Sequence, residues 1–171
     1  AQNSCDVTGT AAINMTGGTV LYGLYGGGNV NSKINGKTTI NVNGGTVGAS
    51  ATPANVYGGG LGAATRAKGD VEVNIGSINN NVTSGDAVIY GDVYGGSAKG
   101  VTNCNDAGTA RNGNTTTNVT LNGGTIHGSL YGGGHGIEGA TANVWGPVTV
   151  VVNGGSVKQP LGNPGSIFGC N

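Results

Sequence analysis

The chain contains the segment Ile40-Asn-Val-Asn-Gly-Gly-Thr-Val47, followed by Val56-Tyr-Gly-Gly-Gly60, and these two motifs decide its fold. The first motif alternates apolar and polar residues, which is typical of a half-buried strand. Its Gly-Gly pair permits a sharp turn, because glycine adopts positive φ without a Cβ clash. The pair of motifs recurs, and the aromatic residue of the second motif lies at positions 25, 57, 94, 131 and 168.

The repeat period is 32 residues once and then 37 residues three times. One repeat cannot bury its own apolar side chains, whereas copies stacked about 4.8 Å apart bury them continuously. We therefore predict an all-β fold, a parallel β-solenoid (β-helix) of about five coils with no helices of note. A β-sandwich or a small propeller is the alternative, but propeller blades need four strands in about 40–50 residues.

The prediction covers residues 1–171 as one domain with five repeats. We place these repeats at about 6–35, 36–68, 69–112, 113–141 and 142–171. In each repeat the alternation predicts two side chains that point inward together. These pairs are Ile13 with Met15, Ile40 with Val42, Val71 with Val73, Val119 with Leu121, and Val150 with Val152.

Stacked repeats place equivalent residues in columns. The residue before the Gly-Gly turn predicts an asparagine ladder, in which side-chain amides hydrogen-bond from one repeat to the next. Its members are Asn43, Asn74, Asn122 and Asn153, with Thr16 at the equivalent position of the first repeat. The alternative is that asparagine merely favours the turn.

The aromatic residues of the second motif predict another column. Its members are Tyr25, Tyr57, Tyr94, Tyr131 and Phe168. An apolar residue precedes each of them, so one of the two columns faces the core and the other faces outward. An outward column could bind glycan rings or pack against a second filament. The alternative, which we favour, is that the stacked rings stabilise the fold.

Composition excludes several classes of function. Glycine makes up 38 of the 171 residues and the net charge is zero, with scattered cations, so nothing indicates a nucleic-acid partner. No apolar run reaches the roughly 18–20 residues of a membrane-spanning helix. The carboxylates Asp70 and Glu72 point outward from one strand without catalytic neighbours, and His127 and His135 lack ligand partners. We predict no enzymatic activity, no metal site and no cofactor.

The chain has three cysteines, Cys5, Cys104 and Cys170, so at least one thiol is left free or paired with another chain. Five stacked coils separate Cys5 from Cys170 by on the order of 20 Å, and a disulfide requires Cα atoms within about 7 Å. Across a head-to-tail junction, Cys170 would instead lie beside Cys5 of the next copy. Alternatively, Cys104 pairs with Cys170 through long loops and Cys5 forms the cross-link.

The repeats start within a dozen residues of the first residue and stop inside the last copy of the second motif. Monomeric solenoids need caps, because an open coil presents unpaired strand edges. We therefore expect a structural protein that assembles with itself head to tail into a fibre. The alternative is a spacer or adhesin module of a longer surface protein, which binds glycans or other surface proteins.

The pattern Asn-Gly-Gly-Thr-Val followed by Val-Tyr-Gly-Gly-Gly resembles the glycine-rich repeats of large secreted or adhesin-like surface proteins of gut-type bacteria, especially Bacteroidota. The resemblance covers nearly the whole chain. It implies a secreted protein of the bacterial surface or of a fibre, with a structural or adhesive role and no catalytic residues. Those proteins are long arrays, whereas five repeats are present here.

Overall fold

A computed structural model describes residues 5–79, 82–84, 86–158 and 164–170. Every regular element in these ranges is a β-strand, which confirms the all-β prediction, and no helix there could cross a membrane. The predicted single domain also includes residues 1–4 and 171, which lie outside the described residues.

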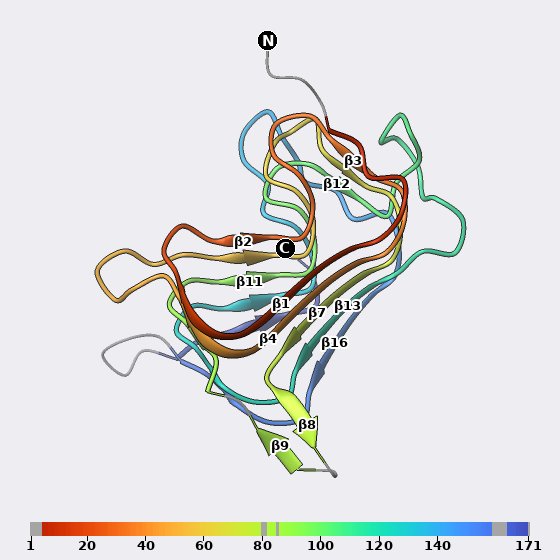
Figure 1. The fold of residues 1–171 in the computed structure, drawn as a ribbon. Coiled ribbons are helices and arrows are strands. Elements are labelled where there is room, and N and C mark those ends of the chain that lie inside the picture. The colour runs from red at the N-terminus through yellow and green to blue at the C-terminus, as the bar shows by residue number, and fades with distance from the viewer. Residues whose placement is uncertain (1–4, 80–81, 85, 159–163, 171) are drawn as a thin grey trace.

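The largest sheet contains eight strands and holds the first motif of every repeat (Figure 1). Its strands are parallel, and equivalent strands of successive repeats lie side by side in chain order. Its longer strands are β1 (Ala11–Val20), β4 (Thr38–Val47), β7 (Val71–Ile75), β13 (Thr117–Leu121) and β16 (Val148–Val152). After the turn, the ladder continues through the ends of β1 and β4 into β10 (Val88–Ile89), β14 (Thr125–Ile126) and β17 (Ser156–Val157).

The second motif forms a parallel sheet of five very short strands, again in chain order. They are β2 (Leu24–Tyr25), β5 (Val56–Tyr57), β11 (Val93–Tyr94), β15 (Leu130–Tyr131) and β18 (Ile167–Phe168). A third parallel sheet contains β3 (Lys33–Ile34), β6 (Arg66–Ala67) and β12 (Val101–Thr102). Parallel bridges extend this third ladder to Val7 at one side and to Val144 at the other.

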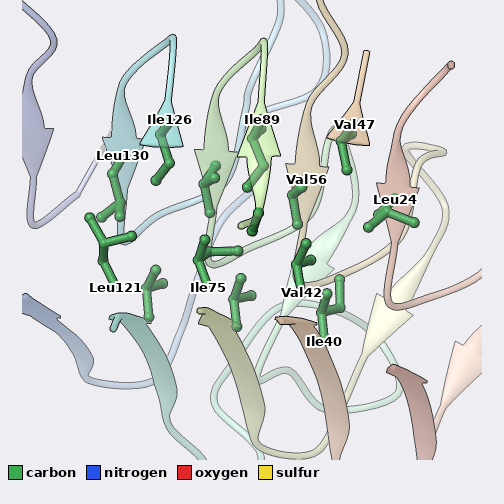
Figure 2. Close-up of a cluster of buried hydrophobic side chains, with 14 of the residues drawn as sticks. Leu24, Ile40, Val42, Val47, Val56, Ile75, Ile89, Leu121, Ile126 and Leu130 are labelled. Carbon is green, nitrogen blue, oxygen red and sulfur yellow. The ribbon is translucent and has the colours of Figure 1, made fainter. Parts of the chain in front are cut away.

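The core lies between the curled eight-stranded sheet and the five-stranded sheet (Figure 2). Ile40, Val73 and Val119 point into it from the first sheet, and Val56 and Val93 point into it from the second, all with no exposed surface. Burial of each such side chain contributes about 1.5–3 kcal/mol relative to leaving it in water. The core is continuous from repeat to repeat, so each repeat stabilises its neighbours.

The third repeat departs from the predicted alignment in two ways. Its strand is shifted by two residues, so that Val73 rather than Val71 lies opposite Ile40. In this register Ile75 is buried opposite Val42 and Leu121, whereas the motif alignment placed it at the first turn glycine. After the turn, the antiparallel hairpin of β8 (Ser77–Asn79) and β9 (Val82–Ser84) leaves the ladder, and β10 continues it in place of the predicted Ser77–Ile78.

The second motif needs glycine after its aromatic residue, because successive repeats approach each other most closely there. A Cβ added at Gly58 would meet the carbonyl oxygen of Gly95 and a methyl group of Val71. The equivalent atom at Gly95 would meet the carbonyl oxygen of Gly132. Alanine at these positions would therefore force the backbone ladder apart.

We expect Gly58→Ala to destabilise the fold by about 1–3 kcal/mol, the usual effect of overpacking a buried site. Gly17→Ala is the matched control, since a Cβ at Gly17 has no atom within 4 Å and this glycine does not adopt positive φ. Its effect should stay within about 0.5 kcal/mol. Urea unfolding followed by circular dichroism measures the stability of both variants. Equal unfolding midpoints would contradict the close approach of Gly58 to Gly95.

Candidate functional site

The second motif stacks five aromatic rings in one column. Neighbouring ring centroids are 5.2, 5.0, 4.8 and 5.0 Å apart from Tyr25 to Phe168, and their planes differ by 5–8°. The residue before each of the first four rings lies in the core, so the rings stand on the other side of the five-stranded sheet. The sheet register explains the stacking, because it places Tyr57 directly opposite Tyr25 and Tyr94.

Loops cover the middle of this aromatic column. Tyr57 and Tyr94 are only 6% and 4% exposed to solvent, and they form a second apolar cluster with Ala98. The imidazole of His135 lies 5.1 Å from the Tyr94 ring, and its Nδ1 is 3.2 Å from the Tyr57 hydroxyl. These two tyrosines therefore present no open face to a glycan ring, and the column stabilises the stack.

A polar column runs beside the rings, at the residue before the second motif in every repeat after the first. The side chain of one repeat accepts a hydrogen bond from the backbone N–H of the next, as in Asp92 N to Asn55 Oδ1 at 2.7 Å and Ser129 N to Asp92 Oδ1 at 2.7 Å. The Tyr94 hydroxyl donates to Asp92 Oδ2 at 3.0 Å. Burial raises the pKa of Tyr94, and the nearby charge of Asp92 raises it further.

Asparagine side chains do bond between repeats, but the observed column differs from the predicted one. Asn153 Nδ2 donates to Asn122 Oδ1 at 2.8 Å, as the repeat alignment placed them. Asn74 donates instead to Asn41 at 2.9 Å, because the two-residue shift brings Asn41 rather than Asn43 opposite it. Asn43 falls at the irregularity where Met15 pairs with Val42 but Thr16 pairs with Gly44.

The structure contains no disulfide between the three cysteines, all of which are among the described residues. Cys5 and Cys170 are exposed. Cys104 is buried, its Sγ–H donates to the carbonyl oxygen of Val101 at 3.6 Å, and burial raises the pKa of its thiol. The alternative in which Cys104 pairs with Cys170 is therefore not the arrangement found.

Several other charged side chains form pairs or hydrogen bonds along the stack. Glu72 forms an ion pair with Lys37 at 2.6 Å, and Asp70 accepts hydrogen bonds from the backbone and side chain of Thr116. Asp106 binds Lys68 at 2.7 Å, which lowers the pKa of this exposed carboxyl. Within the described ranges, no three His, Cys, Asp or Glu side chains come together as a metal site.

The two end faces of the stack carry equivalent hollows. One, of about 410 Å³, is lined by residues that include Cys5, Val7, Ala11 and Gly27. The other, of about 330 Å³, is lined at the equivalent ladder positions by Val144, Val148 and Gly133, and also by Cys170. The two hollows therefore lie at equivalent positions on the first and the last repeat. An exposed cysteine lines each of them.

Several of these features were not predicted. The sequence carries only a weak signal for the polar column: a polar residue, Asn55, Asp92 or Ser129, stands directly before the second motif. The position of His135 beside the tyrosines has no such signal, because a loop places it there. Comparisons of the chain with protein-family models, with curated proteins and with solved structures found no match.

The contribution of ring stacking can be separated from that of the Tyr94 hydroxyl. Tyr94→Phe removes the hydrogen bond to Asp92 but keeps the ring, whereas Tyr94→Leu removes both. We expect Tyr94→Leu to be less stable than Tyr94→Phe by about 1–3 kcal/mol, since two ring pairs contribute about 0.5–1.5 kcal/mol each. Chemical unfolding measures the difference, and equal stabilities would show that stacking contributes nothing.

Alkaline pH should destabilise the fold through the buried tyrosines. Burial raises the pKa of both Tyr57 and Tyr94 above the unfolded value of about 10. The folded state then keeps protons that the unfolded chain has lost, so this contribution is complete below about pH 10 and decreases as the pH rises further. Unfolding free energies between pH 8 and 11.5 should fall with pH, and less steeply in Tyr94→Phe. An equal slope in both proteins would contradict the assignment to Tyr94.

Proposed function

We propose that each repeat forms one coil of a parallel β-solenoid, and that copies of this extracellular structural protein assemble head to tail into a filament. One observation carries the proposal. Four ladders run through successive repeats, and among the described residues the terminal strand of each ladder is paired on one side only. Equivalent strands follow chain order within each parallel ladder, which supports the solenoid, because a coiled path is the simplest route between such strands.

The two faces are complementary in their hydrogen-bonding groups. At equivalent positions, N–H groups donate to the following repeat, as in Thr38 N to Asp70 O and Leu130 N to Ser166 O. By continuation, the N–H groups of Val148, Ile167 and Gly169 point out of the last face. The carbonyl groups of Thr10, Gly23 and Tyr25 occupy the matching positions at the first face.

Side chains also match across such a junction. Val150 of one copy would lie opposite Ile13 of the next, and Phe168 would stack on Tyr25. Phe168 is 44% exposed and Val152 is 50% exposed, whereas their equivalents in the second and third repeats are buried. Stacking the next copy would cover this apolar surface. The net charge of zero gives no overall repulsion against association.

The extracellular setting rests on composition and on the resemblance to secreted repeat proteins. Low charge and abundant glycine, asparagine and threonine are shared with such surface proteins. In the alternative, the chain is a spacer or adhesin module, and further repeats of a longer protein cover the same two faces. The two functions differ in whether the isolated chain polymerises.

Electron microscopy of the purified chain tests the proposal, and one edge variant makes the test specific. Asn153 N donates inward to Leu121 O, so by alternation the N–H of Val152 faces the open edge. We expect long uniform filaments from the unmodified chain. Val152→Pro should reduce filament mass at least about tenfold, because proline removes the edge donor.

Val152→Thr is the matched control, since it keeps both the N–H and a β-branched side chain. It should polymerise like the unmodified chain. Circular dichroism of all three proteins verifies that the fold is retained. Single small particles from the unmodified chain would contradict self-assembly and favour the spacer or adhesin module. Filaments that form equally in Val152→Pro would contradict assembly through the β16 edge.

A further inference from the structure

Cys170 stands where the earlier repeats have glycine. It follows Phe168 by two residues, as Gly27 follows Tyr25, Gly59 follows Tyr57 and Gly96 follows Tyr94. A Cβ added at Gly27 would lie 2.8 Å from the backbone nitrogen of Gly60 in the following repeat. At Gly96 it would lie 2.8 Å from the backbone nitrogen of Gly134. A side chain at this position therefore points along the stack toward the backbone of the following repeat.

Cys5 stands on the opposite face at the position that such a side chain would reach. The bridge between Val7 and Ile34 aligns Cys5 with Ser32, two residues earlier in each segment. Ser32 adjoins the glycine segment that ends four residues before it in the same loop, since a Cβ at Gly28 would lie 2.7 Å from its Cβ. By the same spacing, Cys5 of one copy adjoins the segment that contains Cys170 of the copy before it.

In a head-to-tail contact the Cys170 side chain would enter the hollow that contains Cys5, and the glycine backbone of the next copy would shift to admit its Cβ. In the interior of the stack, glycine backbones leave no space for a Cβ at this corner. At the first face, however, a hollow of about 410 Å³ is lined by Gly26, Gly27, Gly28 and Cys5. Cys170 lines the matching hollow on the last face. In a head-to-tail contact the two hollows would therefore face each other, with one thiol in each.

We propose that these two thiols form a disulfide between Cys170 of one subunit and Cys5 of the next, which locks the filament covalently. This inference rests on the proposed head-to-tail assembly. Cys104 takes no part, because it is buried and its thiol pKa is raised, which leaves little reactive thiolate. The arrangement also explains why the cysteine count is odd: two thiols link subunits and one stays in the interior.

The reaction requires an oxidant, and a low-molecular-weight disulfide such as oxidised glutathione is sufficient. One cysteine thiolate attacks this disulfide, forms a mixed disulfide and releases one small thiol. The second cysteine thiolate then attacks the protein-bound sulfur and releases the second small thiol. In total, two protein thiols become one disulfide and one small disulfide becomes two small thiols, so electrons and protons balance.

Non-reducing denaturing electrophoresis after incubation with oxidised glutathione tests the lock. The unmodified chain and Cys104→Ser should both give a ladder of covalent oligomers that collapses to monomer with reductant. Cys5→Ser and Cys170→Ser should give no species beyond dimer. An equimolar mixture of these two variants should yield a linked Cys5–Cys170 peptide in mass spectrometry. A ladder that requires Cys104, or no ladder from the unmodified chain, would overturn the lock.

Microscopy of the same samples distinguishes failure of the lock from failure of the filament. The double variant Cys5→Ser/Cys170→Ser should still form filaments under oxidising conditions, because the ladders and rings remain. Filaments without any covalent ladder would overturn the disulfide and leave the filament standing. A ladder made of irregular aggregates would overturn both, since the linkage would then arise from random collisions of exposed thiols.

Discussion

The ladder of backbone hydrogen bonds between equivalent residues of successive repeats is the constraint on which the structure depends. Strands of two residues, such as β5 and β11, are too short to stabilise a sheet by themselves. They persist because each pairs on both sides with the same short strand of a neighbouring repeat. Glycine after the aromatic residue keeps the backbones close enough for these bonds, so the sequence bias toward glycine follows from the ladder.

Exact register between repeats turns every ladder into columns of identical side chains. Rings then stack on rings at about 5 Å, and amides bond to amides, as in Asn41 with Asn14 and Asn74. Each contact is weak alone, about 0.5–1.5 kcal/mol for a ring pair. Together they penalise any slip along the stack, because a slipped strand loses all its column contacts at once. The aromatic column is thus a register device as well as a source of stability.

Much of this was predictable, because a repeated motif shows which residues are equivalent. The aromatic column, the inward apolar residues of the first two repeats and the pairing of Asn122 with Asn153 follow directly from that equivalence. The prediction was wrong where burial overrode the motif: Ile75, aligned with a turn glycine, is buried in the strand opposite Val42, and this register places Asn74 opposite Asn41 rather than Asn43. The position of His135 depends on a loop path, for which the repeat carries no information.

A parallel ladder also gives the stack a direction. Each repeat bonds to both neighbours at fixed positions: Val56 N donates to Asp92 O of the following repeat, whereas Gly91 N donates to Ala54 O of the preceding one. The two end faces are therefore different from each other and complementary. A contact between unlike faces related mainly by translation does not close on itself, so it generates an open filament rather than a dimer. A cysteine on each face would then link only correctly ordered neighbours, because two like faces cannot form the ladder that holds the thiols together.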